Sequence, residues 1–318
     1  MNEYRASKPK IWVALVTVYI LWGSTYLAIR VGVQTIPPFL LAAIRFLVAG
    51  GLLYGWRRLV KDPSPTRLEW RSAAVVGFFM LVAGNGTLAW AEQRVVSGIA
   101  ALIVGTSPIW MVLIDAIRPG GRRPNFQTGL GILIGFAGIA LLIGPGGFSG
   151  NGQSIDPIGL AALVFCAITW SAGSLINRDA KLPESPLMGI SMEMLAGGVM
   201  LLLLGTLTGE WSRLELAKVS TASLVGLLYL IVFGAMIGFS AYLWLLRVAP
   251  TPLVSTYAYV NPLIAIFVGN LLADELLTAR ILIAALVIVS SVALINTGRS
   301  ASVKSEGDLL AAHPCGED

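Results

Sequence analysis

Long apolar segments constrain the fold of this chain more than any other feature. A membrane-spanning helix needs about 20 mostly apolar residues, with a range of about 17–25. Ten segments meet that requirement, and short connections rich in polar residues, proline or glycine separate them. They cover residues 11–29, 38–57, 71–90, 96–117, 126–144, 157–177, 187–207, 222–246, 252–273 and 280–297. We therefore predict an all-α membrane protein with ten transmembrane helices.

The composition agrees with this prediction and argues against several other classes of protein. Hydrophobic residues make up 56% of the chain and charged residues 12%, whereas soluble domains carry about 25% charged residues. The net charge of +5 does not predict a nucleic-acid partner, because the basic residues lie between the apolar segments. The cysteines are Cys166 and Cys315 and the only histidine is His313, so we expect no disulfide, no metal site, no cofactor and no enzymatic activity. We interpret the N-terminal apolar segment as an uncleaved first helix, since it is too long for a signal peptide.

Two stretches of the chain, 148 residues apart, resemble each other. Trp22–Arg30 recurs as Trp170–Arg178, and an ungapped alignment of 32 residues from these tryptophans contains seven identities. The same offset aligns Pro38 with Pro186, Arg45 with Glu193 and Gly50 with Gly198. A duplicated membrane unit is typical of secondary transporters whose site lies between the repeats.

The distribution of basic residues predicts the orientation of the helices. With the N-terminus placed in the cytoplasm, 16 of the 22 Lys and Arg residues fall on the cytoplasmic side, five fall outside, and Arg45 lies within a span. This asymmetry predicts that both termini are cytoplasmic. Five helices per half is an odd number, so the second half must be inverted relative to the first. We therefore predict one repeat over residues 1–147, an inverted repeat over 148–297, and a disordered cytoplasmic tail over 298–318.

Several motifs resemble those of the drug/metabolite transporter superfamily, and in particular its EamA-type members with ten helices. The motifs are Trp22-Gly-Ser, Ala43-Ile-Arg45-Phe, Gly98-Ile-Ala-Ala-Leu-Ile with Ser107-Pro108, and Asn261-Pro262 with Asp274-Glu275. Within the superfamily the chain looks most like the YddG-type aromatic amino-acid exporters. The resemblance implies a central cavity between the repeats and export of amino acids or similar small metabolites. The chain departs from the pattern at about Gly121, where many relatives carry an acidic residue equivalent to Glu275.

Two prolines occupy equivalent places in the two halves. Pro108 and Pro262 lie near the middle of the fourth and ninth predicted spans. Each proline lacks an N–H group, so the carbonyls of Val104 and Ala258 lose their helical partners. Such carbonyls must face protein or a watery cavity. We therefore interpret both prolines as hinges beside a binding site; the alternative is a packing kink whose free carbonyl a Ser or Thr side chain or a water satisfies.

Aromatic and amide side chains within the spans are candidates for substrate binding. Aromatic faces with polar tips suit apolar or aromatic substrates and also organic cations. The alternatives are interfacial aromatic belts and, for Asn85 between two glycines, a hydrogen bond that joins helices. The predicted substrate-binding residues are Tyr26, Asn85, Trp110, Trp170, Tyr257 and Asn261.

Three charged residues are predicted within the membrane. Arg45 and Glu193 occupy matched positions in the two halves, each seven residues after an aligned proline. An ionisable group at such a depth should face the interior and have a partner. Arg45 could hold a substrate carboxylate and Glu193 an ammonium group or a proton. The alternative is a structural ion-pair network that includes Asp115.

The sequence favours a secondary transporter of the bacterial inner membrane that exports amino acids by alternating access. Its partners would be a small-molecule substrate and the lipid bilayer, and we expect a monomer. One alternative is an exporter of drugs, purines or other metabolites. A passive channel is a further alternative, although the chain has neither a carbonyl filter motif nor a ring of like charges. The sequence contains no Walker-type phosphate loop, so ATP is not expected to drive transport directly.

Overall fold

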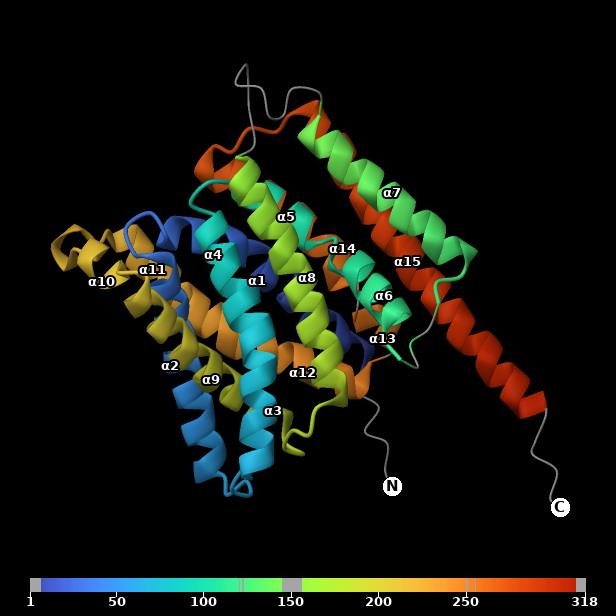
Figure 1. Ribbon diagram of the computed structural model, residues 1–318, viewed down its shortest axis with the longest axis horizontal. Helices are drawn as coiled ribbons and strands as arrows, with labels where there is room; N and C mark the ends of the chain where they lie inside the picture. Colours follow the sequence, from blue (N-terminus) through green and yellow to red (C-terminus); the bar gives the residue numbers. More distant parts are fainter. Residues whose placement is uncertain are drawn as a thin grey trace.

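A computed structural model of the chain describes residues 7–119, 121, 123–144, 156–249, 251–254 and 256–312. Within these ranges every regular element is helical (Figure 1). The first half contains α1 (Lys8–Gly32), α2 (Pro38–Leu59), α3 (Arg67–Gly77), the π-helical η1 (Phe78–Gly86), α4 (Thr87–Ala91), α5 (Ser97–Val104), α6 (Ser107–Ile117) and α7 (Phe126–Ile143). The second half contains α8 (Pro157–Asp179), α9 (Pro186–Leu207), α10 (Glu210–Arg213), the 3-10 turn η2 (Leu216–Lys218), α11 (Thr221–Tyr229), the π-helical η3 (Leu230–Ile237), α12 (Gly238–Val248), α13 (Thr251–Val254), α14 (Tyr257–Ala273) and α15 (Ala279–Ala312).

The described helices form a multi-pass membrane bundle. Nine of them are long and apolar enough to cross a membrane, and the shorter apolar helix Tyr257–Ala273 coincides with the ninth span predicted from the sequence. Each of the other predicted spans overlaps one of these nine helices. The third span combines α3, η1 and α4, and the fourth combines α5 and α6. A count of ten membrane crossings remains a prediction.

Prolines and capping residues fix where many helices begin. Pro38, Pro157 and Pro186 each stand in the first turn of their helix, where the missing N–H group costs no helical hydrogen bond. The Thr66 side chain accepts a hydrogen bond from the Glu69 N–H, and the Glu69 carboxylate accepts one from the Thr66 N–H. The turn signals read from the sequence therefore mark real helix boundaries.

The antiparallel helices α2 and α9 pack closely along their lengths (Figure 1). Both contain 22 residues, and α9 begins 148 residues after α2. A Cβ atom on Gly50 would lie 2.8 Å from the Met194 Cβ, and one on Gly198 would lie 2.9 Å from the Leu47 Cγ. Because these glycines carry no side chain, the two helices approach closely at their crossing.

Acidic residues beyond the ends of α2 and α9 bind the start of the other helix. Asp62 follows α2 and accepts a hydrogen bond from Ser185, the residue before α9, and the Arg57 guanidinium holds the Asp62 pKa below its usual range. Glu210 follows α9 and accepts hydrogen bonds from the N–H groups of Phe39 (3.3 Å) and Leu40 (2.9 Å). Burial raises the pKa of Glu210, and the two N–H donors act in the opposite direction. Asp62 and Glu210 are also 148 residues apart.

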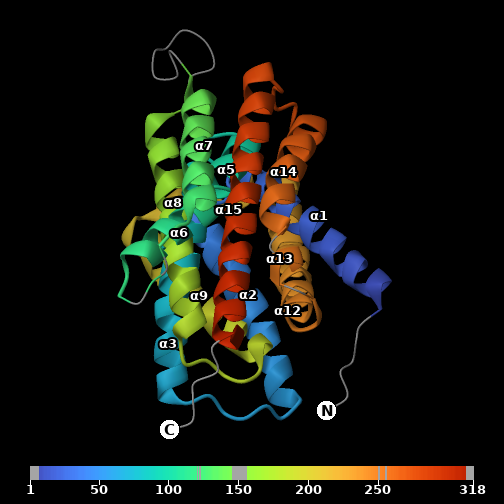
Figure 2. The same ribbon diagram turned by 90° about the vertical axis from the view of Figure 1, so that its right-hand side faces the viewer.

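Helices α7 and α15 form a second close pair at one edge of the bundle (Figures 1 and 2). Cβ atoms on Gly131 and Gly138 would each lie 2.7 Å from an isoleucine of α15. Gly131 and Gly138 therefore let α7 and α15 approach closely, whereas no atom lies within 4 Å of the Cβ position on Gly129.

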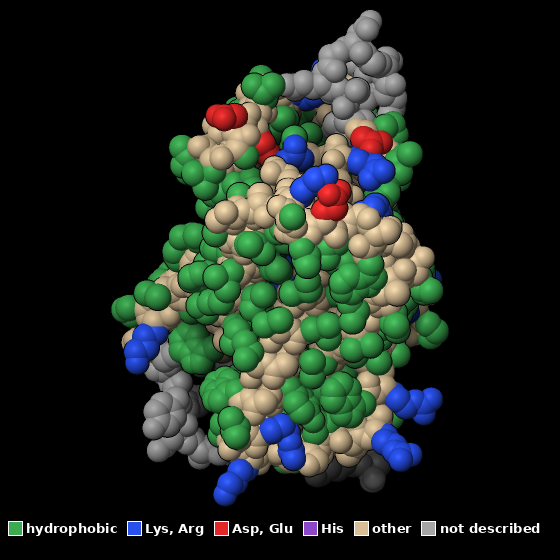
Figure 3. Space-filling view, turned by 90° about the vertical axis from the view of Figure 1, so that its left-hand side faces the viewer, with side chains coloured by type: hydrophobic (Ala, Val, Ile, Leu, Met, Phe, Trp, Pro, Cys, Tyr) green, Lys and Arg blue, Asp and Glu red, His purple; other side chains and the backbone are tan. Residues whose placement is uncertain are grey.

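The surface has the character of a membrane protein. Large apolar side chains are exposed along the helices, for example Val13 (67%), Leu133 (68%) and Leu203 (57%). On the face shown in Figure 3, apolar side chains cover the middle, Lys and Arg project at one end, and acidic side chains lie together with further Lys and Arg toward the other end. Lipid would solvate such an apolar band, which would be costly to expose to water.

Some sequence predictions concern residues that lie outside the described ranges or at their ends. Cys315, His313 and the boundary between residues 147 and 148 lie outside the described residues. The segment 298–318 is predicted to be disordered, and α15 extends into it as far as Ala312. Disorder of the tail therefore stays a prediction.

Candidate functional site

The fourth predicted span is broken just before its proline. Helix α5 ends at Val104 and α6 begins at Ser107, with Pro108 in its first turn. The Ser107 hydroxyl donates to the Val104 carbonyl that Pro108 leaves without a helical partner. The Ser171 hydroxyl of α8 donates to the Ser107 carbonyl at 2.8 Å. The sequence predicts this free carbonyl, and the structure shows that a serine satisfies it.

The second proline lies inside a helix and contacts the first break. Pro262 is in the second turn of α14, and a Cβ atom on Gly105 would lie 2.8 Å from the Pro262 Cγ. On the other side of α14, a Cβ atom on Gly23 would lie 2.6 Å from the Ile264 Cβ. The prolines of the two halves thus meet near one level of the bundle, where α1, α5 and α14 pack closely.

Four aromatic side chains from α1, α12 and α14 form what we call the aromatic cluster: Trp22, Phe239, Tyr242 and Tyr257. The Trp22 ring centroid lies 5.2 Å from Phe239, 5.0 Å from Tyr242 and 5.2 Å from Tyr257. Tyr242 and Tyr257 are joined by a side-chain hydrogen bond. The Trp22 indole N–H points to the Gly234 carbonyl in η3 at 3.3 Å. Four π-systems and two hydroxyls therefore meet at one place inside the bundle.

Tyr26 lies one helical turn beyond Trp22 on α1 and connects the aromatic cluster to a charged region. It is close enough to Tyr257 on one side, and to Glu92 and Cys166 on the other, for charges on these groups to interact. Tyr26 and Tyr257, predicted separately to bind substrate, are thus brought together. Glu92 was not among the predicted site residues.

Arg45 and Glu92 are buried charged residues in this region. Arg45 is 7% exposed and Glu92 is 1% exposed. Neither the Nε atom of Arg45 nor either carboxylate oxygen of Glu92 has a hydrogen-bond partner among the described residues. A Cβ atom on Gly234 would lie 3.3 Å from an Arg45 terminal nitrogen, so this glycine leaves room for the guanidinium. We refer to Arg45 and Glu92 as the unpaired charges.

Beside these unpaired charges, Arg30 and Glu275 have ion-pair and hydrogen-bond partners. Glu275 accepts hydrogen bonds from the Ser97 N–H (2.9 Å) and the Gly98 N–H (3.1 Å) at the start of α5. The Arg30 Nε lies 3.4 Å from Glu275, and an Arg30 terminal nitrogen donates to the Val95 carbonyl at 2.7 Å. These two residues therefore hold α1, α5 and the segment before α15 together.

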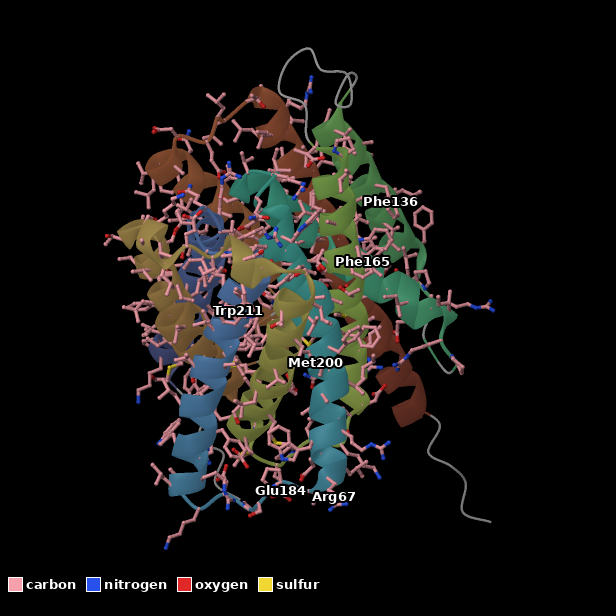
Figure 4. The ribbon with its side chains drawn as sticks, turned by 60° about the vertical axis from the view of Figure 1, so that its left-hand side comes forward. Arg67, Phe136, Phe165, Glu184, Met200 and Trp211 are labelled. Carbon is pink, nitrogen blue, oxygen red and sulfur yellow. The ribbon has the colours of Figure 1, made fainter. Side chains whose placement is uncertain are left out.

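The predicted site residues Asn261, Trp170, Asn85 and Trp110 occupy different surroundings. Asn261 is 7% exposed, one turn beyond Tyr257 on α14, and its side-chain oxygen has no partner in the described part of the chain. Trp170 packs against Gly84, the neighbour of Asn85, with 3.5 Å from a Cβ position on that glycine to the indole ring. Trp110 contacts Phe136, which lies on α7 near the outside of the bundle (Figure 4), with ring centroids 5.6 Å apart. Trp110 therefore lies on the α7 side, whereas Asn261 adjoins the aromatic cluster.

The acids Glu193 and Asp115 have their own partners in this structure. Asn177 donates to Glu193 at 3.2 Å, and the Arg118 Nε lies 2.9 Å from Asp115. Helix α9 runs antiparallel to α2, and Gly50 packs against Met194, so Glu193 lies about 10 Å along the bundle from the level of Arg45. The matched pair Arg45 and Glu193 therefore does not form an ion pair with itself or with Asp115.

Sequence reasoning missed Glu92 and the capping roles of Glu275 and Glu210. Glu92 directly follows the predicted end of the third span at residue 90, so it reads as a loop acid. The importance of Glu275 could be inferred from the sequence, because this residue belongs to the Asp274-Glu275 motif. For Glu92 only the packing of α4 against α8 and α2 shows the burial.

A pocket of about 560 Å³ opens between α3, α6 and α8. Its walls are apolar, with Val75, Ile114 and Leu175, and its rim carries Arg71, Arg118 and Asp179. Along α8 the pocket extends from Ala180 to Ala172, two residues from Trp170. It is therefore an open depression along the last turns of α8.

Comparison with known proteins relates this geometry to a family. The model of the EamA-like transporter family matches the chain twice, over residues 10–144 and 157–297. The chain belongs to this family. EamA-like membership makes this protein a multi-pass membrane transporter, and the described residues supply the helices that such a protein requires.

Similar proteins cover nearly the whole of this EamA-like chain. The uncharacterized inner membrane transporter YedA of Escherichia coli (strain K12) is 38% identical over 287 residues, which are 90% of each chain. The uncharacterized transporter YvbV of Bacillus subtilis (strain 168) is 26% identical and covers 91% of this chain, with 93% of its own length matched. A protein of known crystal structure superposes with a TM-score of 0.62 at 23% identity, covering 91% of this chain and 96% of its own. This last similarity concerns the fold alone.

Proposed function

We propose that this EamA-like transporter exports amino acids, apolar and aromatic ones foremost, through a central cavity between two halves that open alternately. This is the activity expected of the YddG-type aromatic amino-acid exporters, which the chain resembles in its motifs. The observation that carries the proposal is that the buried Arg45 Nε has no hydrogen-bond partner among the described residues, within electrostatic range of Glu92, which in turn lies near Tyr26.

The chemistry of Arg45 suits a carboxylate ligand. A guanidinium group presents a planar set of donors that matches the two oxygens of a carboxylate. Arg45 Nε donates to no described residue, and Gly234 leaves space beside its terminal nitrogens. An unsatisfied buried donor is costly in a fold, so its persistence points to a ligand that binds there transiently.

The aromatic cluster suits the side chain of the substrate. Its rings lie 5.0 to 5.6 Å apart, in tilted and edge-to-face arrangements, and such surfaces bind apolar and aromatic groups well. The hydroxyls of Tyr242 and Tyr257 and the amide of Asn261 add polar atoms to the same region. The predicted substrate-binding residues Asn85, Trp110 and Trp170 then belong to the path that leads to this region rather than to its centre.

Several observations support alternation between two inverted repeats. The family model matches each half separately, and α2 and α9 have the same length at an offset of 148 residues. Asp62 and Glu210 bind the start of the opposite helix at that same offset. These relations are those of a two-fold axis that runs in the membrane plane between α2 and α9.

The orientation follows from the basic residues. The pocket rim residues Arg71, Arg118 and Asp179 lie on segments that the charge distribution assigns to the cytoplasm. The first turns of α1 and the last turns of α15 point toward the lower half of Figure 2, where α2 meets α3. We propose that both termini are cytoplasmic, that the pocket is the inner mouth of the transport path, and that the protein works as a monomer in a bacterial inner membrane, as the name of YedA suggests for that relative.

Counterflow in liposomes tests this function. Purified protein is reconstituted in vesicles loaded with radiolabelled L-phenylalanine, and the outside is challenged with each amino acid, with purines and with a quaternary ammonium dye. We expect phenylalanine, leucine and other apolar amino acids to accelerate release in a saturable manner. Acceleration only by purines or by the dye would instead assign the protein to the export of drugs or other metabolites, for which the aromatic cluster is also suited. Unsaturable release without exchange would favour a passive channel.

A further inference from the structure

The two unpaired charges lie where four charged residues from different elements come together. Glu92 interacts electrostatically with Arg30 of α1, with Arg45 of α2 and with Glu275 before α15. Tyr26 of α1 and Cys166 of α8 are the other titratable groups beside it. Arg30 and Glu275 are satisfied by each other and by backbone groups. The positively charged Arg45 and the negatively charged Glu92 are therefore the two whose side-chain atoms lack partners among the described residues.

Arg45 and Glu92 do not satisfy each other either. Each lies within electrostatic range of the other, yet no ion pair or hydrogen bond joins them among the described residues. Opposite charges in a dry interior gain by moving into contact, because each loses its hydration there. The Arg45 guanidinium lies against Gly234 on η3, and Glu92 follows the last residue of α4. A group between them that offers an anion to Arg45 and a cation to Glu92 would satisfy both.

We propose that Arg45 and Glu92 form a binding site for the zwitterionic part of an α-amino acid. Arg45 binds the substrate carboxylate, and Glu92 binds the substrate ammonium group. Tyr26 lies beside Glu92 and close to Tyr257, so the substrate side chain extends toward the aromatic cluster. This inference rests on the proposed export of amino acids and specifies how the substrate class is recognised.

The same geometry gives Glu92 a second role. When the ammonium group leaves, the buried carboxylate has lost the cation that contacts it directly, and a proton takes the place of that cation. One proton is bound for each ammonium group released, so proton and substrate compete for Glu92. Competition for one site yields exchange, in which a proton moves inward for each amino acid that moves outward. The bacterial proton gradient would then drive export.

Substrate analogues that lack one charge test the site in the wild-type protein. 3-Phenylpropionate lacks the ammonium group of phenylalanine, and phenethylamine lacks the carboxylate. In counterflow with labelled L-phenylalanine, we expect each analogue to compete at least about tenfold more weakly than phenylalanine, the effect of about 1.4 kcal/mol of lost binding. Equal competition by either analogue would overturn the zwitterion site without any variant being needed.

Charge-neutralising variants assign the two roles. In Glu92→Gln, competition by 3-phenylpropionate relative to phenylalanine should rise about tenfold, because no unpaired carboxylate then remains. In Arg45→Gln, the relative competition by phenethylamine should rise instead. Glu193→Gln is the matched control, since Glu193 is also buried and already has Asn177 as a partner; it should leave the ranking of the analogues unchanged. An unchanged ranking in both Glu92→Gln and Arg45→Gln would contradict the site.

Proton movement gives an independent readout. A pH-sensitive dye inside wild-type vesicles should report proton entry during phenylalanine release, and the apparent affinity for phenylalanine should fall as the pH is lowered. Both effects should be absent in Glu92→Gln. Loss of exchange of every amino acid by the wild type would refute the proposed function itself. Normal phenylalanine exchange by Glu92→Gln, with proton entry intact, would refute only the inference about Glu92.

Discussion

At the scale of single residues, buried charges in this protein fall into two groups. Glu275, Glu210 and Asp115 each have hydrogen-bond or ion-pair partners that hold helices together. Arg45 Nε and the Glu92 carboxylate have none among the described residues. Stability would favour partners for both, and we therefore propose that the unpaired charges bind a substrate.

The buried acids that have partners should contribute to the free energy of unfolding. Replacing Glu275 by Ala removes two backbone hydrogen bonds at the start of α5 and leaves Arg30 without its carboxylate. We expect Glu275→Ala to lower the free energy of unfolding by about 3–5 kcal/mol, and Glu275→Gln to lower it less because the amide oxygen still accepts. Thermal unfolding of the detergent-purified protein measures this. A melting temperature equal to that of the wild type would show that Glu275 does not anchor α5.

Only some of the buried charged residues could be identified from the sequence. Arg45 could be found because it is a charged residue in the middle of an apolar segment. Glu92 could not, because its burial depends on where α4 ends relative to α8 and α2, which no local pattern encodes. The partners of Glu193 and Asp115 likewise come in part from other helices. Glu193 accepts from Asn177 of α8, and Asp115 pairs with Arg178 of α8 as well as with the nearby Arg118.

At the scale of elements, irregular helix segments surround the candidate site. The third and eighth spans each contain a π-helical segment, η1 and η3, and the fourth is broken between α5 and α6. Local departures from α-helical hydrogen bonding are frequent at functional sites. The spans themselves could be predicted from apolar length, and the break from Ser107-Pro108. The π-helical segments could not, because within an apolar span no residue pattern distinguishes a π-helical turn from an α-helical one.

The break before Pro108 should be needed for transport. In Pro108→Ala the new N–H group can bond the Val104 carbonyl, so α5 and α6 can join into one helix and the hinge stiffens. We expect expression near that of the wild type and an exchange rate that falls about tenfold, a barrier change of about 1.4 kcal/mol. Counterflow at equal protein content measures the rate.

Pro186→Ala is the control for this variant. Pro186 stands in the first turn of α9, where no helical hydrogen bond is missing. Its replacement should leave the exchange rate within about twofold of the wild-type value. If Pro108→Ala exchanges phenylalanine as fast as Pro186→Ala, Pro108 has only a packing role.

At the scale of the whole molecule, the two halves are related through α2 and α9. Equal helix length, glycines at the crossing and the reciprocal contacts of Asp62 and Glu210 all recur at an offset of 148 residues. The repeated Trp22–Arg30 pattern in the sequence anticipates this relation. A rocking motion of the halves about the α2–α9 contact would close the pocket between α3, α6 and α8 and open an equivalent path on the other side.

Distances between spin labels test this alternation most directly. One pair, on Leu68 of α3 and Ile117 of α6, spans the proposed inner mouth, and a second pair, on Ala222 of α11 and Leu271 of α14, occupies equivalent exposed positions 154 residues later. Electron–electron double resonance of the reconstituted protein should show two populations for each pair, and added L-phenylalanine should shift the two pairs in opposite directions. A single narrow distance for both pairs, unchanged by phenylalanine and by pH, would contradict transport by alternating access between inverted repeats.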